Sequence, residues 1–321
     1  MNGSARDMTS GRPLLSVVIV NWNGREDLRR CLDSLREQRR TDFETIVVDN
    51  DSNDGSTAMV THRYPDVVLL DAGANVGFAE GCNIGIRRSR GTWAFMLNPD
   101  TVADREWSAT LMAYLEGPVP ASCGMVQSML LFMDRPDTIN STGIRLRDIG
   151  WGADRQEGAH RTAAAEGPIF CPTAGAAAYR RSMLDAIALE AGYFDPLHFC
   201  YLEDLDLGWR ARLAGYSAHF LPSSFVHHRY HASTAKRSRH WLRKTSVINH
   251  YRTVLKNASR PMLRRSSWRG LLNGIEITAT GGAAIPRDIA GALRAGYAAR
   301  TEVERIRKLD RLEVETIWVG R

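Results

Sequence analysis

Two acidic clusters carry the side chains of this sequence that are best suited to catalysis or metal binding. The first lies in residues 199–210, FCYLEDLDLGWR, where Glu203, Asp204 and Asp206 stand among apolar residues at helical spacing. Buried carboxylates are costly unless they are paired, bind a metal or take part in chemistry. The pattern therefore predicts a helix whose first turn presents Glu203 and Asp204 to a cavity. Acidic residues in a first turn are also ordinary partners of the helix dipole, so this segment alone leaves both interpretations open.

The second acidic cluster follows an apolar run earlier in the chain. In WAFMLNPDT, five apolar residues lead directly into Asn98, Pro99 and Asp100. Oxygen ligands at the carboxyl end of a strand suit a hard divalent cation. The same tripeptide is also typical of a turn that ends a strand, because Asn, Pro and Asp are common turn formers.

The first hundred residues alternate between strand patterns and helix patterns. The predicted strands are 14–20, 43–48, 67–70 and 93–97, and the predicted helices are 26–38, 56–63 and 80–89. This order predicts an α/β fold with an open, mostly parallel sheet, in which ligands bind at the carboxyl ends of the strands. Polar residues follow three of the predicted strands: Asn21 and Asn23, then Asp49, Asp51 and Asp54, then Asn98 and Asp100.

Three further segments could line a ligand site. Residues 73–85, GANVGFAEGCNIG, predict a glycine loop that leads into a helix, a pattern that is equally compatible with a plain surface turn. Residues 143–167 are rich in glycine and charge and predict loops or a hairpin beside a cleft. Residues 172–181, PTAGAAAYRR, supply small residues before a helix start.

The absence of G-x-G-x-x-G and P-loop sequences argues against a nicotinamide-type Rossmann enzyme or a P-loop NTPase.

The composition limits the class of protein and its partners. With 321 residues, 44% of them hydrophobic, the chain can form one large domain or one domain with an appendage. The net charge of +6 favours an anionic partner such as nucleic acid, a membrane surface or a phosphorylated substrate. Five widely spaced cysteines without a C-x-x-C pair indicate reduced thiols. No signal-peptide or membrane-spanning pattern is present, so we expect a cytoplasmic protein that could lie peripherally on the inner face of the cell membrane.

Seven motifs, in this order and spacing, resemble the family 2 inverting glycosyltransferases of the GT-A fold, and among them the bacterial rhamnosyltransferase branch. The motifs are VIVNWNG, VVDNDSNDGS, NVGFAEGCNIGI, LNPD, TAGAAAYRR, YLEDLDLGWR and VHHRYHAST. The resemblance covers roughly residues 14–250. It implies a Rossmann-like nucleotide-sugar-binding half at 14–100 joined to an acceptor-binding and catalytic half at 101–257. Residues 1–13 are expected to be a flexible N-terminus, and residues 258–321 a basic, helical C-terminal extension outside the resemblance.

The resemblance also implies a nucleotide pocket and a metal site. The residues expected to face the nucleotide are Asn21, Asn23, Asp49, Asp51, Asn83 and Asn98. Asn98 replaces the first Asp of the family's D-x-D motif, which lowers the charge of the site and should weaken metal binding. Asp100 would still bind Mg²⁺ or Mn²⁺ bridged to the donor diphosphate, with His228 as a further ligand and His227 or His231 as alternatives. Asp54 is expected to cap the helix that begins at residue 56.

Catalytic roles follow from the resemblance in the same way. Asp204 matches the general base that deprotonates the acceptor hydroxyl, and Glu203 would orient the acceptor or the donor. Asp206 and Arg210 are expected to form a structural i, i+4 pair worth a few tenths of a kcal/mol. The expected acceptor or phosphate contacts are Gly175, Arg229 and Arg237. The basic run at 229–244 could bind phosphates, face an anionic membrane or be a solvated helix face.

Together these motifs imply transfer of a sugar from a nucleotide diphosphate donor, dTDP-rhamnose or a UDP-sugar, to an acceptor hydroxyl. The acceptor would be a saccharide or a lipid-linked diphosphate in bacterial cell-surface polysaccharide synthesis. Two alternatives stay open: a catalytically weakened nucleotide-sugar-binding scaffold, supported only by the missing first Asp, and a natural-product glycosyltransferase. Nucleic-acid binding is disfavoured because no helix-turn-helix, zinc or stacking motif is present. A charged helix expected at 301–312 could form a homodimer or touch the membrane.

Overall fold

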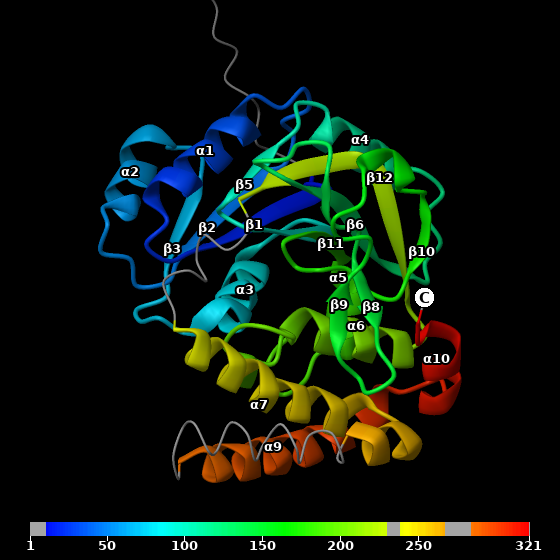
Figure 1. Cartoon of the computed structure of the whole chain (residues 1–321). Helices are drawn as coiled ribbons and strands as arrows, with labels where there is room; N and C mark the ends of the chain where they lie inside the picture. Colours follow the sequence, from blue (N-terminus) through cyan, green and yellow to red (C-terminus); the bar gives the residue numbers. More distant parts are fainter. Residues whose placement is uncertain (1–10, 230–237, 267–283, 321) are drawn as a thin grey trace, which may run out of the picture.

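A computed structural model of the chain describes residues 11–229, 238–266 and 284–320. Most of the expected flexible N-terminus lies outside these residues, and so do His231 and Arg237. The described chain forms a central sheet with helices on both of its faces (Figure 1). The predicted α/β fold is therefore confirmed.

Among the described residues, the central sheet has ten strands and is mixed, with four parallel and five antiparallel neighbouring pairs. Its order is β10-β12-β6-β11-β4-β1-β2-β3, with β5 paired to β12 and β7 paired to β6, while β8 and β9 form a separate hairpin. The strands are β1 Leu15–Asn21, β2 Glu44–Asp49, β3 Val68–Asp71, β4 Trp93–Leu97, β5 Thr101–Ala103, β6 Cys123–Phe132, β7 Ile139–Ser141, β8 Ile144–Leu146, β9 Gly152–Asp154, β10 Gly167–Ile169, β11 Ala176–Arg180 and β12 Ser217–His228.

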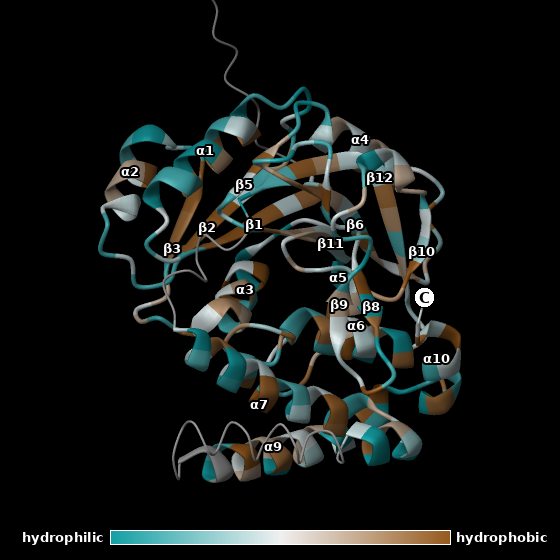
Figure 2. Cartoon of the chain, in the orientation of Figure 1, coloured by the Kyte–Doolittle hydropathy of each residue, from teal (hydrophilic) through white to brown (hydrophobic). Residues whose placement is uncertain are grey.

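The helices form two layers that follow from the alternation of side chains along the strands. On β1, Val17 and Ile19 face the layer of α1, α2 and α4, whereas Val18 and Val20 face the layer of α3, α5 and α6. Figure 2 shows these apolar strands between helices whose outer faces are polar. The helices are α1 Arg25–Arg36, α2 Ser56–Arg63, α3 Gly77–Arg88, α4 Trp107–Glu116, α5 Arg181–Ile187, α6 Glu203–Leu213, α7 Arg239–Asn257, α9 Ala284–Ile306 and α10 Arg311–Trp318.

The glycine loop expected at 73–85 is for the most part helix α3, which begins at Gly77. Two of its glycines face β1, where a Cβ on Gly81 would lie 2.6 Å from a methyl of Val20. A Cβ on Gly85 would lie 2.2 Å from a methyl of Val18. These two glycines therefore let the helix pack closely on the strand, whereas Gly77 at the start of α3 lines the cavity described below.

The second half of the sheet contains a strand that the sequence did not resolve. β11 lies antiparallel between β4 and β6, with Ala176 opposite Leu97. This reversal brings the start of β11, and Gly175 before it, to the carboxyl end of β4. Along the other edge, β12 runs parallel to β6 and ends at His228. The polar ends of β4 and β12 consequently open on the same side of the sheet.

The C-terminal residues pack on the rest of the chain. α9 lies beside α7 (Figure 1), and α10 contacts α6. The backbone N–H of Ser259 donates to the Glu315 carboxylate over 2.6 Å. The helix expected at 301–312 instead spans the end of α9, a break and the start of α10. The division of the chain at residues 100 and 257 stays a prediction, although α7 does end at Asn257.

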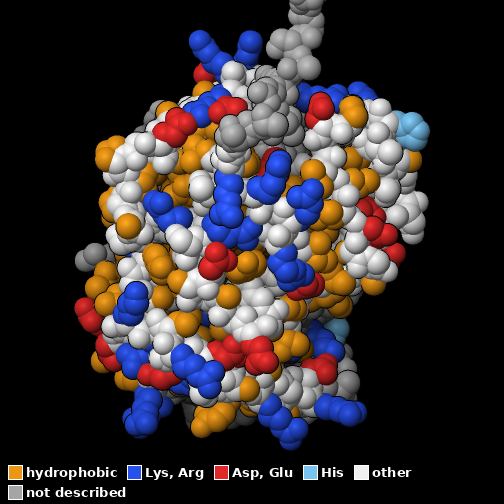
Figure 3. All heavy atoms as spheres, turned by 180° about the vertical axis from the view of Figure 1, so that it is seen from behind, with side chains coloured by type: hydrophobic (Ala, Val, Ile, Leu, Met, Phe, Trp, Pro, Cys, Tyr) orange, Lys and Arg blue, Asp and Glu red, His pale blue; other side chains and the backbone are white. Residues whose placement is uncertain are grey.

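The basic charge is spread over the surface. Figure 3 shows Lys and Arg side chains across one whole face of the molecule, with Asp and Glu side chains between them. None of the described helices combines the length and the apolar character that a membrane crossing needs. All five cysteines are free thiols, and four of them are buried.

Candidate active site

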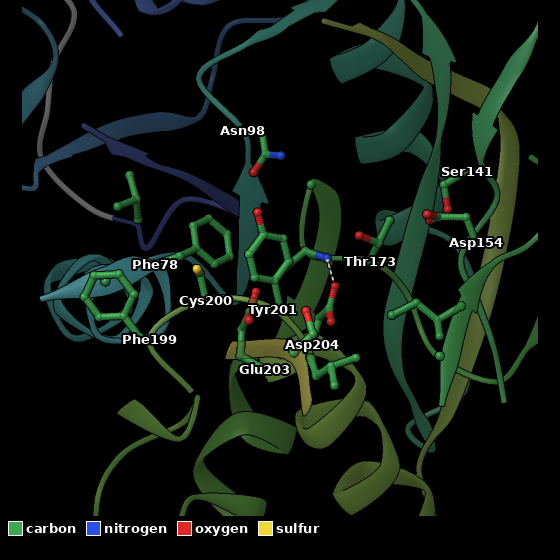
Figure 4. A pocket seen from close by; sticks show the side chains of 18 of the residues that line it. Phe78, Asn98, Ser141, Asp154, Thr173, Phe199, Cys200, Tyr201, Glu203 and Asp204 are labelled. Atoms are coloured by element: carbon green, nitrogen blue, oxygen red, sulfur yellow. Dashed lines mark hydrogen bonds between the residues drawn. The ribbon is translucent and has the colours of Figure 1, made fainter. Parts of the chain in front are cut away.

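A cavity of about 470 Å³ opens at the carboxyl ends of β1 and β4 and beside the first turn of α6. One wall comes from the start of α3, and the opposite wall comes from β7 and the β8–β9 hairpin. Six of the predicted site residues line it: Asn98, Asp100, Gly175, Glu203, Asp204 and His228. Figure 4 shows Asp204 and Glu203 rising from α6 toward its centre, with Asn98 above them.

Asp100 and His228 meet at one end of this cavity. Pairing of β5 with β12 sets Thr101 opposite His228, and the Nε2 atom of His228 lies 3.2 Å from the carboxylate of Asp100. The Nδ1 atom of His228 lies 2.7 Å from the amide oxygen of Asn140, which accepts its proton. That hydrogen bond leaves the lone pair of Nε2 directed at Asp100, the tautomer that a metal-binding histidine requires. Asn98 lies 3.4 Å from the same Nε2.

These donors fit a divalent cation. A carboxylate, an imidazole and a carboxamide are all ligands of Mg²⁺ or Mn²⁺, and the amide of Asn140 orients the imidazole. Of the two histidines that the structure describes here, only His228 reaches Asp100. His227 points to the other face of β12, where its ring packs on Phe225 and burial lowers its pKa.

A second cluster of potential ligands lies beneath the cavity and is already filled. Asp195, His198 and Asp206 come together in the core, but the Lys256 ammonium forms ion pairs with both carboxylates. Lys256 and Arg210 hold the pKa of Asp206 far below its ordinary range against the cost of burial. Burial, assisted by Lys256, lowers the pKa of His198 to about 4. A cation would have to displace the ammonium, so we interpret this cluster as a buried ion-pair network.

This network corrects one expectation from the sequence. The Arg210 guanidinium does lie 3.1 Å from Asp206 at i, i+4 spacing, but both side chains are fully buried. The few tenths of a kcal/mol expected for the pair hold for exposed helix surfaces. A buried pair costs far more to break, because the surviving charge stays desolvated.

Asp204 and Glu203 occupy different electrostatic environments in the same helix turn. The carboxylate of Asp204 accepts hydrogen bonds from the backbone N–H groups of Ala174, over 3.2 Å, and Leu205, over 2.8 Å. Burial raises its pKa, and these donors limit the rise by stabilising the anion. Burial, followed by the charge of Asp204, raises the pKa of Glu203 well above its ordinary value. One Glu203 oxygen is buried and has no hydrogen-bond partner within the described chain.

The hydrogen bonds decide which of the two carries the charge. Two backbone N–H groups stabilise the anion of Asp204, whereas one Glu203 oxygen has no donor within the described chain, so we place the negative charge of the pair on Asp204. Because Asp204 is the ionised member of the pair, it is the one that can accept a proton, and its raised pKa makes it a stronger base than an ordinary Asp. Protonated Glu203 can donate a hydrogen bond into the cavity.

The loop before α6 is strained and clamped. Phe199, Tyr201 and Leu202 have φ values of 60°, 72° and 67°, a left-handed region that non-glycine residues rarely adopt. The side-chain amide of Asn249 on α7 donates to the carbonyl oxygens of His198, Cys200 and Tyr201 at 2.7–2.9 Å. Strain of this kind persists where the surrounding structure over-determines it, commonly at functional sites.

Residues 16–188 match the family described as Glycosyl transferase family 2. The chain belongs to this family. A relative, the N-acetylglucosaminyl-diphospho-decaprenol L-rhamnosyltransferase of Mycobacterium tuberculosis (strain CDC 1551 / Oshkosh), is 27% identical over 259 residues, or 68% of this chain and 78% of the relative. The resemblance seen in the motifs is thus confirmed.

Solved structures show that this glycosyltransferase shares the GT-A fold. The mannosyltransferase PcManGT from Pyrobaculum calidifontis, in complex with GDP-Man and Mn²⁺, aligns over 97% of this chain and 89% of its own, with a TM-score of 0.54 and 17% identity. TarS 1–349 of S. aureus, in complex with UDP-GlcNAc, aligns over 91% and 83%, with a TM-score of 0.55 and 17% identity.

In this glycosyltransferase, four of the residues expected to face the nucleotide lie outside the cavity wall: Asn21, Asn23, Asp49 and Asp51. Asn21 is fully buried and donates to the hydroxyls of Ser52 and Ser56 at 3.1 and 3.0 Å. It ties the loop after β2 to the end of β1. The cavity wall here consists instead of Trp22, Asn50, Asn75 and Phe78.

The loop after β2 is held by several of these polar groups. The Asn23 side chain accepts from the backbone N–H of Asn53 over 2.7 Å, and Asp49 accepts from that of Ser52 over 3.2 Å. Asp51 is exposed, with a φ of 67°. Asp54 accepts from the N–H of Ser56 at the start of α2 over 3.0 Å, which is consistent with its expected capping role.

One further expectation is wrong. Asn83 is fully buried in the middle of α3, where its amide bonds the backbone N–H and C=O of Phe194 at 2.9 and 2.8 Å. It therefore joins α3 to the loop at 189–194 and does not face the cavity. Arg229 is exposed and pairs with Asp27 of α1 over 3.0 Å, and its expected contact with the acceptor or a phosphate stays a prediction.

Sequence reasoning missed several residues that the fold brings to the site. Asn140, Ser141, Trp151 and Asp154 come from β7 and the β8–β9 hairpin, each strand of which has three residues. Such short strands carry no period-2 signal. Only the expectation of a hairpin beside a cleft at 143–167 pointed to them.

Proposed function

We propose that the chain is an inverting, metal-dependent glycosyltransferase that moves a sugar from a nucleotide diphosphate donor to an acceptor hydroxyl. The observation that carries this proposal is the convergence of two groups on one cavity. The Asp100–His228 pair has the donors for a divalent cation, and Asp204 has the raised pKa of a general base. The weakened-scaffold alternative has less support, because both groups are present and well oriented.

Asp100 and His228, with Asn98 beside them, would hold Mg²⁺ or Mn²⁺. When bound, the cation supplies positive charge that neutralises the departing diphosphate. Asn140 keeps the imidazole of His228 in the ligating tautomer. Because Asn98 carries no charge, we expect weaker metal binding than a two-carboxylate site would show.

Asp204 would accept the proton of the acceptor hydroxyl as that oxygen attacks the anomeric carbon. The new C–O bond forms while the bond from the anomeric carbon to the diphosphate oxygen breaks, so a single displacement inverts the configuration. The two backbone N–H groups on Asp204 fix its carboxylate, and Glu203 can donate a hydrogen bond to a sugar oxygen nearby. A positioned base of this kind contributes about 10²- to 10⁴-fold to the rate.

We propose dTDP-rhamnose or a UDP-sugar as donor and a lipid-linked diphosphate sugar as acceptor, in cell-surface glycan synthesis. The name of the mycobacterial relative, a rhamnosyltransferase for an N-acetylglucosaminyl-diphospho-decaprenol, supports this choice. The UDP-GlcNAc bound to TarS supports a UDP-sugar as the alternative donor. A cytoplasmic location, peripheral contact with an anionic membrane and a homodimer remain predictions.

A transfer assay tests this function. The full chain is incubated with Mn²⁺, dTDP-rhamnose or UDP-sugars, and short-chain prenyl diphosphates that carry a sugar. We expect a product with one added sugar, whose anomeric configuration by NMR is opposite to that of the donor. Retained configuration would contradict the single displacement, and unchanged donor with every acceptor would favour the scaffold alternative.

A further inference from the structure

The cavity has a fourth carboxylate, which the mechanism above does not use. Asp154 lies at the end of β9 on the wall opposite α3, and the Ser141 hydroxyl lies beside it (Figure 4). Burial, together with the charges of Asp204 and Glu157, raises its pKa to about 6. Within the described ranges, no Lys or Arg forms an ion pair with it. A half-buried carboxylate without a cation is costly unless a ligand uses it.

An aromatic residue of the same hairpin, three positions before Asp154, also lines the cavity. Trp151 lines the cavity, and His250 of α7 stacks on its indole with ring centroids 4.3 Å apart and an interplanar angle of 2°. Burial lowers the pKa of His250 to about 3, so the stacking imidazole is neutral. The stack fixes the orientation of the indole in the cavity wall.

The hairpin that carries both side chains is packed firmly against α6 and α7. At Gly150, where φ is 80°, a Cβ would lie 2.7 Å from a methyl of Val254 on α7. At Gly152, a Cβ would lie 3.0 Å from Ile144 and 3.4 Å from Leu205 on α6. Backbone contacts this close leave the hairpin little freedom, so Trp151 and Asp154 hold fixed positions relative to Asp204.

We propose that Trp151 and Asp154 form the binding subsite for the sugar ring of the acceptor, which makes the acceptor a glycosylated molecule. The indole would cover the apolar face of a hexopyranose, and the carboxylate would accept hydrogen bonds from its hydroxyls. This inference rests on the proposed function, which already takes a sugar-bearing acceptor, and adds to it the residues that recognise that sugar.

The arrangement of the cavity favours the acceptor over the donor as the occupant. In Figure 4, Phe78 and Phe199 lie on one side of Asp204, next to α3, while Asp154 and Ser141 lie on the other side. The α3 side adjoins Asn50 and Asn75, which follow the nucleotide-half strands β2 and β3. Asp204 lies between the two sides in this view, so an acceptor bound at the β8–β9 wall can present a hydroxyl to the base.

The test measures sugar-dependent binding by calorimetry on the full chain. The probes are four short-chain prenyl diphosphates carrying N-acetylglucosamine, glucose, galactose or mannose, and the same prenyl diphosphate without a sugar. We expect the wild type to bind at least one sugar-bearing probe about tenfold or more tightly than the bare probe. In Asp154→Asn the affinity for that sugar-bearing probe should fall by about ten- to a hundredfold, the range for hydrogen bonds to a charged group, while the affinity for the bare probe stays unchanged.

The controls separate this inference from folding and from the proposed function. Asp148→Asn makes the same change at an exposed position of the same hairpin and should keep the preference. Trp151→Leu should also lose it, with thermal unfolding recorded for every variant. The subsite is overturned if no sugar improves binding to the wild type, or if Asp154→Asn keeps the wild-type preference. Metal-dependent binding of dTDP or UDP is measured on the same samples, and its absence would count against the proposed function instead.

Discussion

Replacing Asp204 by Asn removes the proposed base while nearly conserving its shape. If Asp204 accepts the acceptor proton, turnover should fall by about 10²- to 10⁴-fold. That loss corresponds to about 3–5 kcal/mol of activation free energy. Nucleotide affinity should stay within a few-fold of wild type, because the base acts on the acceptor and not on the donor.

The Asp204→Asn substitution also affects the stability of the protein, because Asp204 accepts two backbone hydrogen bonds. Its carboxylate accepts from the N–H groups of both Ala174 and Leu205, whereas an Asn side chain has only one acceptor oxygen. One N–H would therefore lose its partner, at a cost of about 1–3 kcal/mol in stability. Thermal unfolding must confirm that the variant is folded at the assay temperature, and Asp204→Glu offers a second variant that keeps the carboxylate.

The assay is the pH profile of kcat and of kcat/KM for wild type and Asp204→Asn. Burial raises the pKa of Asp204, so wild-type turnover should rise with pH through a value above that of an ordinary Asp as the base loses its proton. The variant should lack this limb at all pH values. Near-wild-type turnover in Asp204→Asn, or a variant that keeps the same limb, would refute the assignment of the base.

Four further predictions concern the metal site, the packing of the core and the carboxyl group of Glu203. Asn140→Ala should weaken Mn²⁺ binding by about 10- to 100-fold in calorimetric titrations, because the imidazole of the ligand loses its orienting partner. Lys256→Met should lower the free energy of unfolding by about 3–5 kcal/mol, since two buried carboxylates lose their cation; unchanged denaturant unfolding would contradict the buried network. Gly85→Ala should cost about 1–3 kcal/mol by its clash with β1, whereas Gly291→Ala in α9, with no atom within 4 Å of the added Cβ, should not destabilise. The Glu203 carboxyl has a higher pKa in the folded protein than its ordinary value of 4.5, so wild-type stability is lost as pH rises above that value. Glu203→Gln removes this titration, and the melting temperature of the variant should therefore exceed that of wild type more at pH 8 than at pH 4. An equal difference at both pH values would contradict a buried carboxyl with a raised pKa.

The strands and helices of the first hundred residues could be predicted because each carries its own periodic signal. Helix 56–63 and strand 93–97 have the predicted bounds, and the other elements differ by one to three residues. α3 was predicted to begin three residues late, because glycines that serve close packing look the same in sequence as glycines that serve a loop. β11 was missed as an antiparallel strand, since pairing direction is a tertiary property.

Asp100, which follows a strong strand, and Asp204, which begins a helix, could be predicted from the pattern, and His228 was expected from the family resemblance; all three line the cavity. Asp49 also follows a predicted strand but lies outside the cavity wall, so a strand end alone does not decide the site. Asn83 was misplaced because an amide in a helix can face either a ligand or a neighbouring backbone, and only the packed structure decides between them. Asp154 was missed because its three-residue strand gives no pattern that sets it apart from a surface loop.

The central claim is that this cavity binds a nucleotide diphosphate through a divalent cation held at Asp100. Calorimetric titration of the full chain with dTDP, UDP and GDP, each with and without Mn²⁺, tests it most directly, with Asp100→Ala as the matched variant. We predict that dTDP or UDP binds in a metal-dependent manner and that Asp100→Ala abolishes this dependence. Binding that is indifferent to Mn²⁺ and to Asp100→Ala, or no binding of any of the three nucleotides, would contradict the claim.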